Sequence, residues 1–339
     1  MFTSQFKVEK TWIDHNDHMN VSYYQYAFQE ALNQYWKHIL NQEDNIRADL
    51  ALSPKNVHIR YLSEALLDQT IDVHSFIYKL NHEGLSVFSP NFITKNIFQA
   101  SISVITASIV NKVKRFVFCS SMARYGSQIS PFNETMPPKP EDPYGIAKVA
   151  VEESLKLLCK THFMDYNIAV PHNIVGPNQK YDDPFRNVMS IFINRNLQNK
   201  PSIIYGDGNQ TRCFSYIDDV IFCLEKLALK KSISKEIINI GPDEETITIN
   251  NLAKLVANVT GYNGDPIHVP GRPLEVKEAT CSSEKARRLL DYKTKTPLID
   301  AIKFTTNYIK NKGTKKFVYN LPVEIKSEIT PETWTKKTI

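Results

Sequence analysis

Glycine is the residue that this sequence lacks most clearly. It has 11 glycines in 339 residues, about half the number that an average usage of ~7% would give. The first 83 residues contain none, and Gly84 is the first. A loop that wraps phosphate groups needs glycines, because only a residue without a Cβ lets the backbone approach the ligand closely. Functions that depend on such a loop near the N-terminus are therefore excluded.

Cysteines are few and far apart. The five stand at positions 119, 159, 213, 223 and 281, and no two form a CxxC pair. An odd number without a repeated spacing indicates reduced thiols in a cytoplasmic protein, and favours neither a disulfide framework nor a zinc site. We therefore expect no metal.

Long apolar segments are also missing. The first ten residues lack the apolar core of a signal peptide. The longest apolar stretch, 96–110, is interrupted by Gln99, Ser101 and Ser103, so we expect it to be too short and too polar to span a bilayer. The expectation is a soluble, cytoplasmic protein without a membrane partner.

Neither sign of charge dominates. The 41 Lys and Arg residues and the 36 Asp and Glu residues give a net charge of +5 and are spread along the chain. A protein that binds nucleic acid would concentrate basic residues on one surface, so we expect no nucleic-acid partner. The composition, 42% hydrophobic and 23% charged, is typical of a globular protein, and the length suggests about two domains.

The hydrophobic pattern divides the chain into two unequal parts. Up to about residue 82 it predicts one helix at 21–40 and strands at 6–13, 57–62 and 70–80. Beyond that point helices and strands alternate, at 96–111, 115–121, 143–163, 167–176, 184–197, 202–205, 217–229, 236–241 and 246–262, where Thr248 can cap a helix. This alternation predicts a parallel, doubly wound α/β sheet.

The clearest chemical pattern combines Ser121 with Tyr144 and Lys148. A Tyr and a Lys four positions apart on a helix share one face. An ammonium beside a phenol lowers the phenol pKa from its usual value of about 10, which makes a base that can take a proton from an alcohol. On its own, the YxxxK spacing is more typical of an ordinary pair of residues on a helix than of a catalytic site. The serine at the end of the preceding strand favours the catalytic interpretation.

Five motifs appear in order from that strand onward: KRFVFCSSMARYG, DPYGIAK, HNIVGP, YGDGNQTRCFSYIDDV and RPLEV. With them, the chain from about Glu83 resembles the extended short-chain dehydrogenase/reductases, specifically the NAD-dependent nucleotide-sugar epimerases of the UDP-glucose 4-epimerase kind. The resemblance implies an incomplete Rossmann-like sheet with a smaller C-terminal α/β substrate lobe. It implies NAD as cofactor and a nucleotide sugar, UDP-linked, as substrate.

The resemblance also implies roles for single residues. Ser121, Tyr144 and Lys148 would be catalytic, with Tyr144 taking a proton from a sugar hydroxyl while the ring carbon passes a hydride to NAD. The expected cofactor contacts are Asn96, Tyr144 and Lys148, and the expected substrate contacts are Asn173, Asn187, Arg212 and Arg272. A planar guanidinium suits bidentate capture of phosphate oxygens, although either arginine alone could form a surface salt bridge.

Two further implications concern the reaction and the assembly. Met122 and Ala123 stand where the related 4,6-dehydratases carry an Asp-Glu pair, and neither can transfer a proton, so epimerisation is favoured over dehydration. Members of the family dimerise through paired helices. The helix expected at 143–163 would be one of them, so a homodimer is expected.

The N-terminal part departs from this family, because a segment without glycine lacks the GxxGxxG turn that holds the cofactor's pyrophosphate. Instead, TWIDHNDHMNVSYYQYAFQEAL (11–32) resembles the start of the central helix in the hotdog acyl-CoA thioesterases. Asp14 would be their catalytic carboxylate, and Asp17 replaces their glycine. Asp14 and His18 are equally well explained as turn and cap residues.

We therefore expect a partial hotdog segment over 1–82, the catalytic part of an NAD domain over 83–180, a substrate lobe over 181–315 interleaved with it, and a tail over 316–339. Three functions stay open. The chain is an NAD-dependent sugar epimerase of polysaccharide biosynthesis, an acyl-CoA thioesterase that uses Asp14, or an inactive fusion of two truncated domains. A sheet without its first strands would expose an apolar edge at 115–119.

Overall fold

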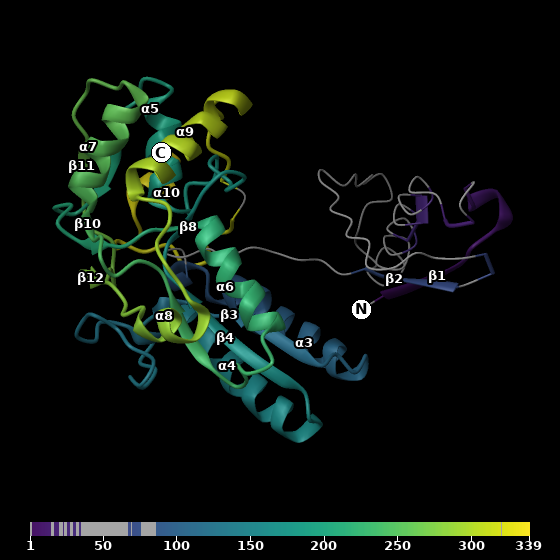
Figure 1. The fold of residues 1–339 in the computed structure, drawn as a ribbon. Helices are drawn as coiled ribbons and strands as arrows, with labels where there is room; N and C mark the ends of the chain where they lie inside the picture. Colours follow the sequence, from purple (N-terminus) through teal and green to yellow (C-terminus); the bar gives the residue numbers. More distant parts are fainter. Residues whose placement is uncertain are drawn as a thin grey trace. The chain divides into compact units, whose positions relative to one another are not determined.

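The computed structural model divides the chain into two compact units, Met1–Lys79 and Leu80–Ile339 (Figure 1). The residues that it describes are 2–14, 17–19, 23, 26–27, 30–31, 34, 67–68, 70–75, 86–319 and 321–339. The strand expected at 57–62, the junction expected near residue 82 and much of the helix expected at 21–40 lie outside these residues. The four domains expected from the sequence stay predictions.

The smaller unit contains an antiparallel strand pair. β1 (Phe2–Lys7) runs against β2 (Thr70–Ser75), with Phe2 opposite Ser75. β2 agrees with the described part of the strand expected at 70–80. The strand expected at 6–13 is wrong in its position, because β1 ends at Lys7 and a 3-10 turn, η1 (Lys10–Trp12), follows.

A small apolar cluster lies among the described residues of this unit. Val8, Trp12 and Met19 are buried, and the ring of Trp12 stacks on Tyr23 with 5.5 Å between ring centroids. Within 21–40, the six described residues, at 23, 26–27, 30–31 and 34, are all helical. Tyr23, one of these helical residues, therefore packs on Trp12, which follows β1.

A parallel sheet forms the centre of the larger unit. Its strand order is β3 (Arg115–Cys119), β4 (Asp165–Pro171), β9 (Ile237–Ile240), with every pair parallel. The connection from β3 to β4 contains α4 (Pro143–His162). This arrangement confirms the expected doubly wound α/β fold. Among the described residues, β3 pairs only with β4, so its other edge has no strand partner there.

Helices cover both faces of this sheet (Figure 1). Phe118 of β3 packs with α3 (Ala100–Val110) and α4, whereas the adjacent Val117 packs with α6 (Ile217–Leu229) and α8 (Glu284–Leu290). Successive side chains of a strand point to opposite faces, so one apolar strand contributes to two separate cores. At the edge expected to be exposed, Phe118 is buried and Cys119 is exposed.

The helix before β3 begins earlier than the sequence pattern indicates. After η2 (Ser86–Phe88), a continuous helical run comprises α2 (Pro90–Ile93), the π-helical η3 (Thr94–Gln99) and α3. The run Pro90–Val110 has 21 residues, so by length and composition it could cross a membrane. The core helices of globular proteins meet the same criterion, and one such helix is weak evidence for a membrane span. The helix is therefore longer than the apolar stretch 96–110 that we expected to be too short to span a bilayer, and that expectation is corrected for its length.

A second lobe follows the sheet, built by α5 (Val188–Asn196), α7 (Ile249–Thr260) and α9 (Leu298–Lys312). These helices share one apolar core with β6 (Ile203–Tyr205). Thr248 caps α7 by accepting a hydrogen bond from Asn251 N at 3.2 Å, as expected. Short strand pairs complete the lobe: β5 (Ile174–Val175) with β8 (Ser215–Tyr216), β6 with β11 (Ile267–Val269), and β7 (Thr211–Arg212) between β10 (Ile247–Thr248) and β12 (Glu278–Ala279).

The C-terminal segment, residues 321–339, packs on other parts of the larger unit. Trp334, in α10 (Glu332–Thr335), lies edge-on to Phe88 and Phe185, with ring centroids 5.7 and 5.3 Å apart. The carboxylate of Glu324 accepts hydrogen bonds from two backbone N–H groups at the start of α2, at 2.9 and 2.8 Å. Residues 321–339 therefore hold the helical run in place.

Candidate functional site

Ser121 lies directly beyond the carboxyl end of β3, as the sequence predicts. It caps the 3-10 turn η4 (Met122–Tyr125), because its Oγ accepts a hydrogen bond from Ala123 N at 3.2 Å. The side chain is buried. Active-site residues of parallel α/β sheets gather at this end of the strands, so β3 places Ser121 where such sites form.

Helix α4 brings Tyr144 and Lys148 to the same place. Asp142 caps the helix by accepting a hydrogen bond from Gly145 N at 2.6 Å, which fixes Tyr144 in the first turn. Lys148 Nζ donates a hydrogen bond of 2.8 Å to the carbonyl of Cys119 at the end of β3, and it lies 5.7 Å from the centroid of the Tyr144 ring. The ammonium therefore sits between the strand end and the phenol.

Tyr144 is only 1% exposed. It shares a small core with Ile93 of α2 and Ile97 of η3. The helical run upstream of β3 thus covers the phenol ring in this structure.

Asn173 connects the serine loop to the second lobe. Its Nδ2 donates to the carbonyl of Cys213 at 2.9 Å and lies 3.9 Å from Met122 Sδ. Met122 follows Ser121, and Cys213 follows Arg212. The backbone of Asn173 has a φ of 27°, in the left-handed region that Asn tolerates better than most residues. A single amide thus bridges the predicted catalytic and phosphate-binding segments.

The two predicted arginines meet on one carboxylate. Arg272 Nη2 and Arg212 Nη2 lie 2.7 and 3.4 Å from the same oxygen, Glu275 Oε1. Burial alone would raise the pKa of Glu275, but the two guanidinium groups outweigh it and hold that pKa below its ordinary value. Arg272 also lies over the ring of Tyr205, 4.9 Å from its centroid. The arginines therefore form one cationic site.

The two remaining asparagines of the predicted site, Asn187 and Asn96, form hydrogen bonds with backbone atoms near them. Asn187 caps α5, accepting from Met189 N at 3.0 Å, and its Nδ2 reaches the carbonyl of Ile174 at 3.5 Å, next to Asn173. Asn96 lies in η3 and donates to Phe92 O one turn back, at 2.7 Å. Two surface hollows, of about 390 and 510 Å³, are lined by none of the predicted site residues.

Asp14 belongs to the smaller unit. Its Oδ1 accepts a hydrogen bond from His18 N at 3.4 Å, and its N donates to His18 O at 2.8 Å. Asp17, at the position of the thioesterase glycine, has a φ of 62°. Such left-handed backbone is where glycine is favoured. These contacts are those of a tight turn.

Sequence reasoning missed three features. The first is Glu275, which lies in the RPLEV motif only three residues after Arg272. The second is a buried group in which Glu152 accepts hydrogen bonds from Ser120 and Arg124 behind the serine loop. The third is a cluster of one histidine and two cysteines. Glu275 and Arg272 are close in sequence. The contacts of Glu275 with Arg212, of Glu152 with Ser120 and Arg124, and within the histidine and cysteine cluster join residues far apart, so they have no local signal.

A parallel doubly wound sheet, a serine at a strand end, and a tyrosine and lysine on the following helix define a short-chain dehydrogenase/reductase-like protein. The family model "NAD dependent epimerase/dehydratase family" matches residues 37–241. This chain belongs to that family. The match begins upstream of Glu83, the position from which the sequence resembles the epimerases, and so includes part of the smaller unit.

Known relatives agree. A Methanocaldococcus jannaschii protein assigned as a UDP-glucose 4-epimerase is 32% identical over 240 residues, covering 68% of this chain and 76% of that protein. The Thermotoga maritima UDP-glucose 4-epimerase, solved with UDP-glucose, has a TM-score of 0.64 and 30% identity, covering 69% of this chain and 76% of that one. The Bacillus cereus UDP-glucuronic acid 4-epimerase, solved with UDP-glucuronic acid and NAD, has a TM-score of 0.60 and 28% identity, covering 65% and 69%.

The described residues fit only part of what NAD requires. Lys148 is anchored at the strand end, but Tyr144 is covered by Ile93 and Ile97. A cradle for the pyrophosphate needs glycines at the start of a helix, and no glycine precedes Gly84. Within the part of the chain that the structure describes, no strand continues the sheet beyond β3. Among the described residues, Lys148 is thus placed at the strand end, and no glycine-rich turn for the pyrophosphate is present.

Proposed function

We propose that this chain is a nucleotide-sugar-binding member of the epimerase family that keeps the substrate grip and the proton-transfer residues but does not hold NAD by itself. The observation that carries this proposal is the pair Arg212 and Arg272 on Glu275, joined through Asn173 to the Ser121 loop. The substrate class is a sugar linked to a nucleoside diphosphate, with UDP as the nucleotide because the relatives named above act on UDP-sugars.

The diphosphate is the part of the ligand that the arginines bind. A guanidinium presents its N–H groups in a planar fork that matches two phosphate oxygens. Glu275 already holds both groups in one place, so little side-chain entropy is lost when the diphosphate arrives. Asn173 and Asn187 flank the adjacent Ile174–Val175 strand, where a sugar would lie between the arginines and the serine loop.

Tyr144 and Lys148 form the proton-transfer pair. The ammonium of Lys148 favours the phenolate form of a neighbouring phenol, and Ser121 can hydrogen-bond the sugar hydroxyl whose proton Tyr144 accepts. The ring of Tyr144 is buried, so the sugar reaches it only after α2 and η3 move from the phenol.

Calorimetric titration of the full chain with UDP-glucose tests the proposal. We expect binding without added NAD, and about 10- to 100-fold weaker binding for Arg212→Gln, because a hydrogen bond to a charged group contributes about 1.5–3 kcal/mol. Arg288→Gln, an exposed arginine of α8, is the matched control and keeps the wild-type affinity. Equal affinities for wild type and Arg212→Gln would refute the diphosphate site.

The role of Tyr144 has its own test. If the protein supplied with NAD interconverts UDP-glucose and UDP-galactose, Tyr144→Phe must lower the rate by at least about 10²-fold, since it removes a general base. An unchanged rate would exclude Tyr144 as the base. If the wild type catalysed this interconversion without added NAD, the claim that the protein does not hold the cofactor by itself would be overturned.

A second candidate function concerns the smaller unit. Asp17, three positions after Asp14, takes the left-handed backbone that the resembling thioesterase motif gives to glycine. As the alternative activity, we propose that this unit hydrolyses acyl-CoA thioesters, with Asp14 as the catalytic carboxylate. Hydrolysis of an acyl-CoA panel would fall at least about 10²-fold in Asp14→Asn. No hydrolysis by the wild type, or hydrolysis that Asp14→Asn leaves unchanged, rejects this alternative.

A further inference from the structure

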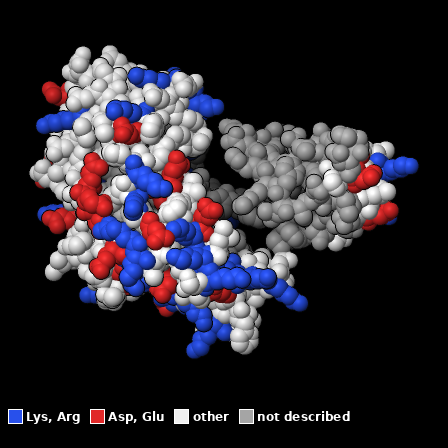
Figure 2. Space-filling view, viewed as in Figure 1, with Lys and Arg blue, Asp and Glu red and all other residues white. Residues whose placement is uncertain are grey.

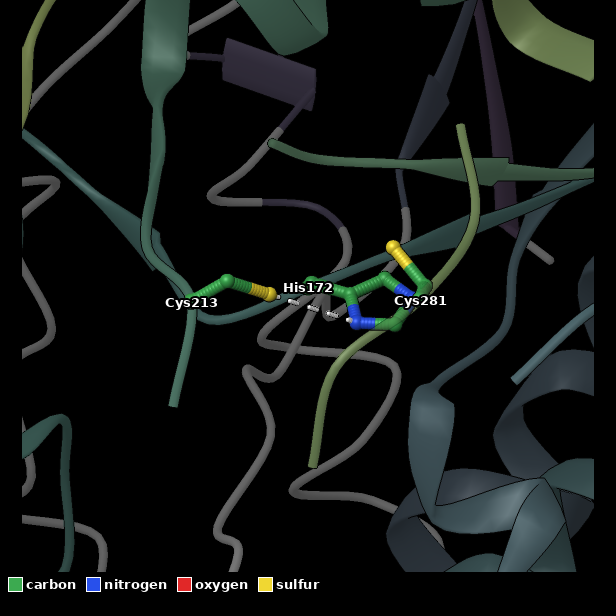
Figure 3. Close-up of side chains that lie close together, drawn as sticks. All are labelled: His172, Cys213 and Cys281. Atoms are coloured by element: carbon green, nitrogen blue, oxygen red, sulfur yellow. Dashed lines mark hydrogen bonds between the residues drawn. The ribbon is translucent and has the colours of Figure 1, made fainter. Parts of the chain in front are cut away.

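Three segments of the larger unit bring soft ligand groups together. His172 follows β4, Cys213 stands between β7 and β8, and Cys281 follows β12. All three side chains are fully buried, at 0% exposure. Figure 3 shows the imidazole ring between the two cysteines. Residues separated by many positions in sequence thus converge at one point in the core.

Their spacing is close to that of metal ligands. Cys213 Sγ lies 3.8 Å from His172 Nδ1, and one atom from each residue lies within 4.8 Å of both others. Metal–sulfur and metal–nitrogen bonds of about 2.3 and 2.0 Å at a tetrahedral zinc ion place two ligand atoms roughly 3.5–3.8 Å apart. The thiols need to move inward only slightly to share one ion.

A second observation shows that protein groups alone do not satisfy this cluster. His172 Nε2 is buried and has no hydrogen-bond partner among the described residues. A buried polar atom without a partner costs about 1–3 kcal/mol, and most buried polar atoms in proteins are paired. Cysteines used only as small apolar side chains would leave this nitrogen without a partner, whereas an ion bound through Nε2 would supply one.

We propose that His172, Cys213 and Cys281 bind a thiophilic metal ion, Zn²⁺ or Cu⁺, in the core of the larger unit. Two thiolates and an imidazole are ligands that both ions accept. The thiols bind as thiolates, so uptake of one ion releases up to two protons. Both ions keep their oxidation state, and no redox partner is needed. This inference does not depend on the proposed nucleotide-sugar site.

The proposed ion would stabilise the segments that carry that site. Arg212 directly precedes Cys213, and Asn173 directly follows His172. Cys281 Sγ lies 3.9 Å from the Oγ of Ser283, which in turn donates to the carbonyl of Gly241 after β9. An ion held by the cluster would tie β4, β7 and β12 together. Since the site is closed to solvent, its role is structural.

Metal analysis of the full-length protein purified in a reducing buffer without chelator tests this inference. We expect about one Zn or Cu per chain, and anaerobic titration of chelator-treated protein with Zn²⁺ or with Cu⁺ distinguishes the two ions. Cys213→Ser and Cys281→Ser should lose the metal, whereas Cys223→Ser, a buried cysteine of α6, should retain it. Because a core variant can fail to fold, thiol labelling of the wild type provides a second readout. We expect two fewer reactive thiols in the metal-loaded protein than in the chelator-treated protein under the same denaturant.

Two results for the wild type would overturn the inference. One is a folded wild type that binds neither ion under anaerobic titration. The other is a Cys213–Cys281 disulfide in the natively purified protein, which would assign the cysteines to a covalent link. Equal metal content in the wild type and a folded Cys213→Ser variant would also reject these ligands.

Discussion

Glu275 is the residue on which the phosphate site depends. Its carboxylate lies between the guanidinium groups of Arg212 and Arg272 and accepts hydrogen bonds from Arg272 at 2.7 and 3.2 Å. Without it, two like charges would face each other in a half-buried place, which is unfavourable. The carboxylate therefore keeps the two arginines together when no anionic ligand is present.

This pairing makes the stability of the larger unit depend on pH. The folded-state pKa of Glu275 lies below its ordinary value of 4.5, so its stabilising contribution is fully present above pH 4.5 and is lost as pH falls through the folded-state pKa. Glu275→Gln should lower the free energy of unfolding by about 1–2 kcal/mol at pH 7. The variant should also lose less stability than the wild type as the pH falls below 4.5. Urea unfolding at pH 7 and in steps below pH 4.5 measures both effects, and an identical acid dependence in the variant would contradict the assignment.

Only some of these individual residues could be predicted from the sequence. Ser121, Tyr144 and Lys148 could be predicted because two of them follow a helical spacing and the third ends an apolar strand. The contact of Glu275 with Arg212 and the cluster of His172, Cys213 and Cys281 could not, because these residues are far apart in sequence and are brought together only by the fold.

The start of α4 is the element that positions the proposed base. Asp142 caps it and Pro143 occupies its first turn. At Gly145 an added Cβ would lie 2.7 Å from the carbonyl of Ala123, in the turn that Ser121 caps. The helix and the serine turn can approach this closely only because residue 145 has no side chain.

We therefore expect Gly145→Ala to push the serine turn away from α4. A clash with backbone in a packed region costs about 1–3 kcal/mol, which thermal unfolding would detect as a lower Tm. Glu153→Ala, an exposed change on the same helix, should alter stability by no more than about 0.5 kcal/mol. A Tm of Gly145→Ala as high as that of Glu153→Ala would show that the turn is not packed as described.

Elements with a strong pattern were easier to predict than those defined by pairing. The helix expected at 217–229 is α6, at the same bounds, because its amphipathic sequence specifies it locally. The strand expected at 6–13 is displaced to Phe2–Lys7, because its position is set by pairing with β2, some 65 residues away. Likewise, α2 and the π-helical η3 extend the run before β3 back to Pro90 without a signal in the sequence.

At the scale of the whole molecule, the charge distribution offers no single-sign surface on the face drawn in Figure 2, where basic and acidic side chains are interspersed. Apolar exposure is more informative. Val110 of α3 and Leu157 of α4 are 72% and 65% exposed, and these two helices pack against each other. Exposed apolar residues on adjacent helices are suited to association with a second copy.

We expect the protein to form a homodimer through α3 and α4. Leu157→Asp should shift it to the monomer, because burying an unpaired carboxylate at an apolar interface is costly. Ile221→Asp on α6 is the matched control, with an exposed apolar residue at 51% on the other face of the sheet. Light scattering after size-exclusion chromatography measures the mass of each. A monomeric wild type, or a dimer that Leu157→Asp leaves intact, would contradict this interface.

We propose that the substrate grip works without a glycine-rich cradle for the pyrophosphate, because no glycine precedes Gly84. The most direct test is to purify the full chain under native conditions, denature it, and measure the NAD released per chain. We predict far less than one NAD per chain from protein that binds UDP-glucose. Release of one NAD per chain would contradict this proposal, because it would show that a backbone without glycine holds the pyrophosphate.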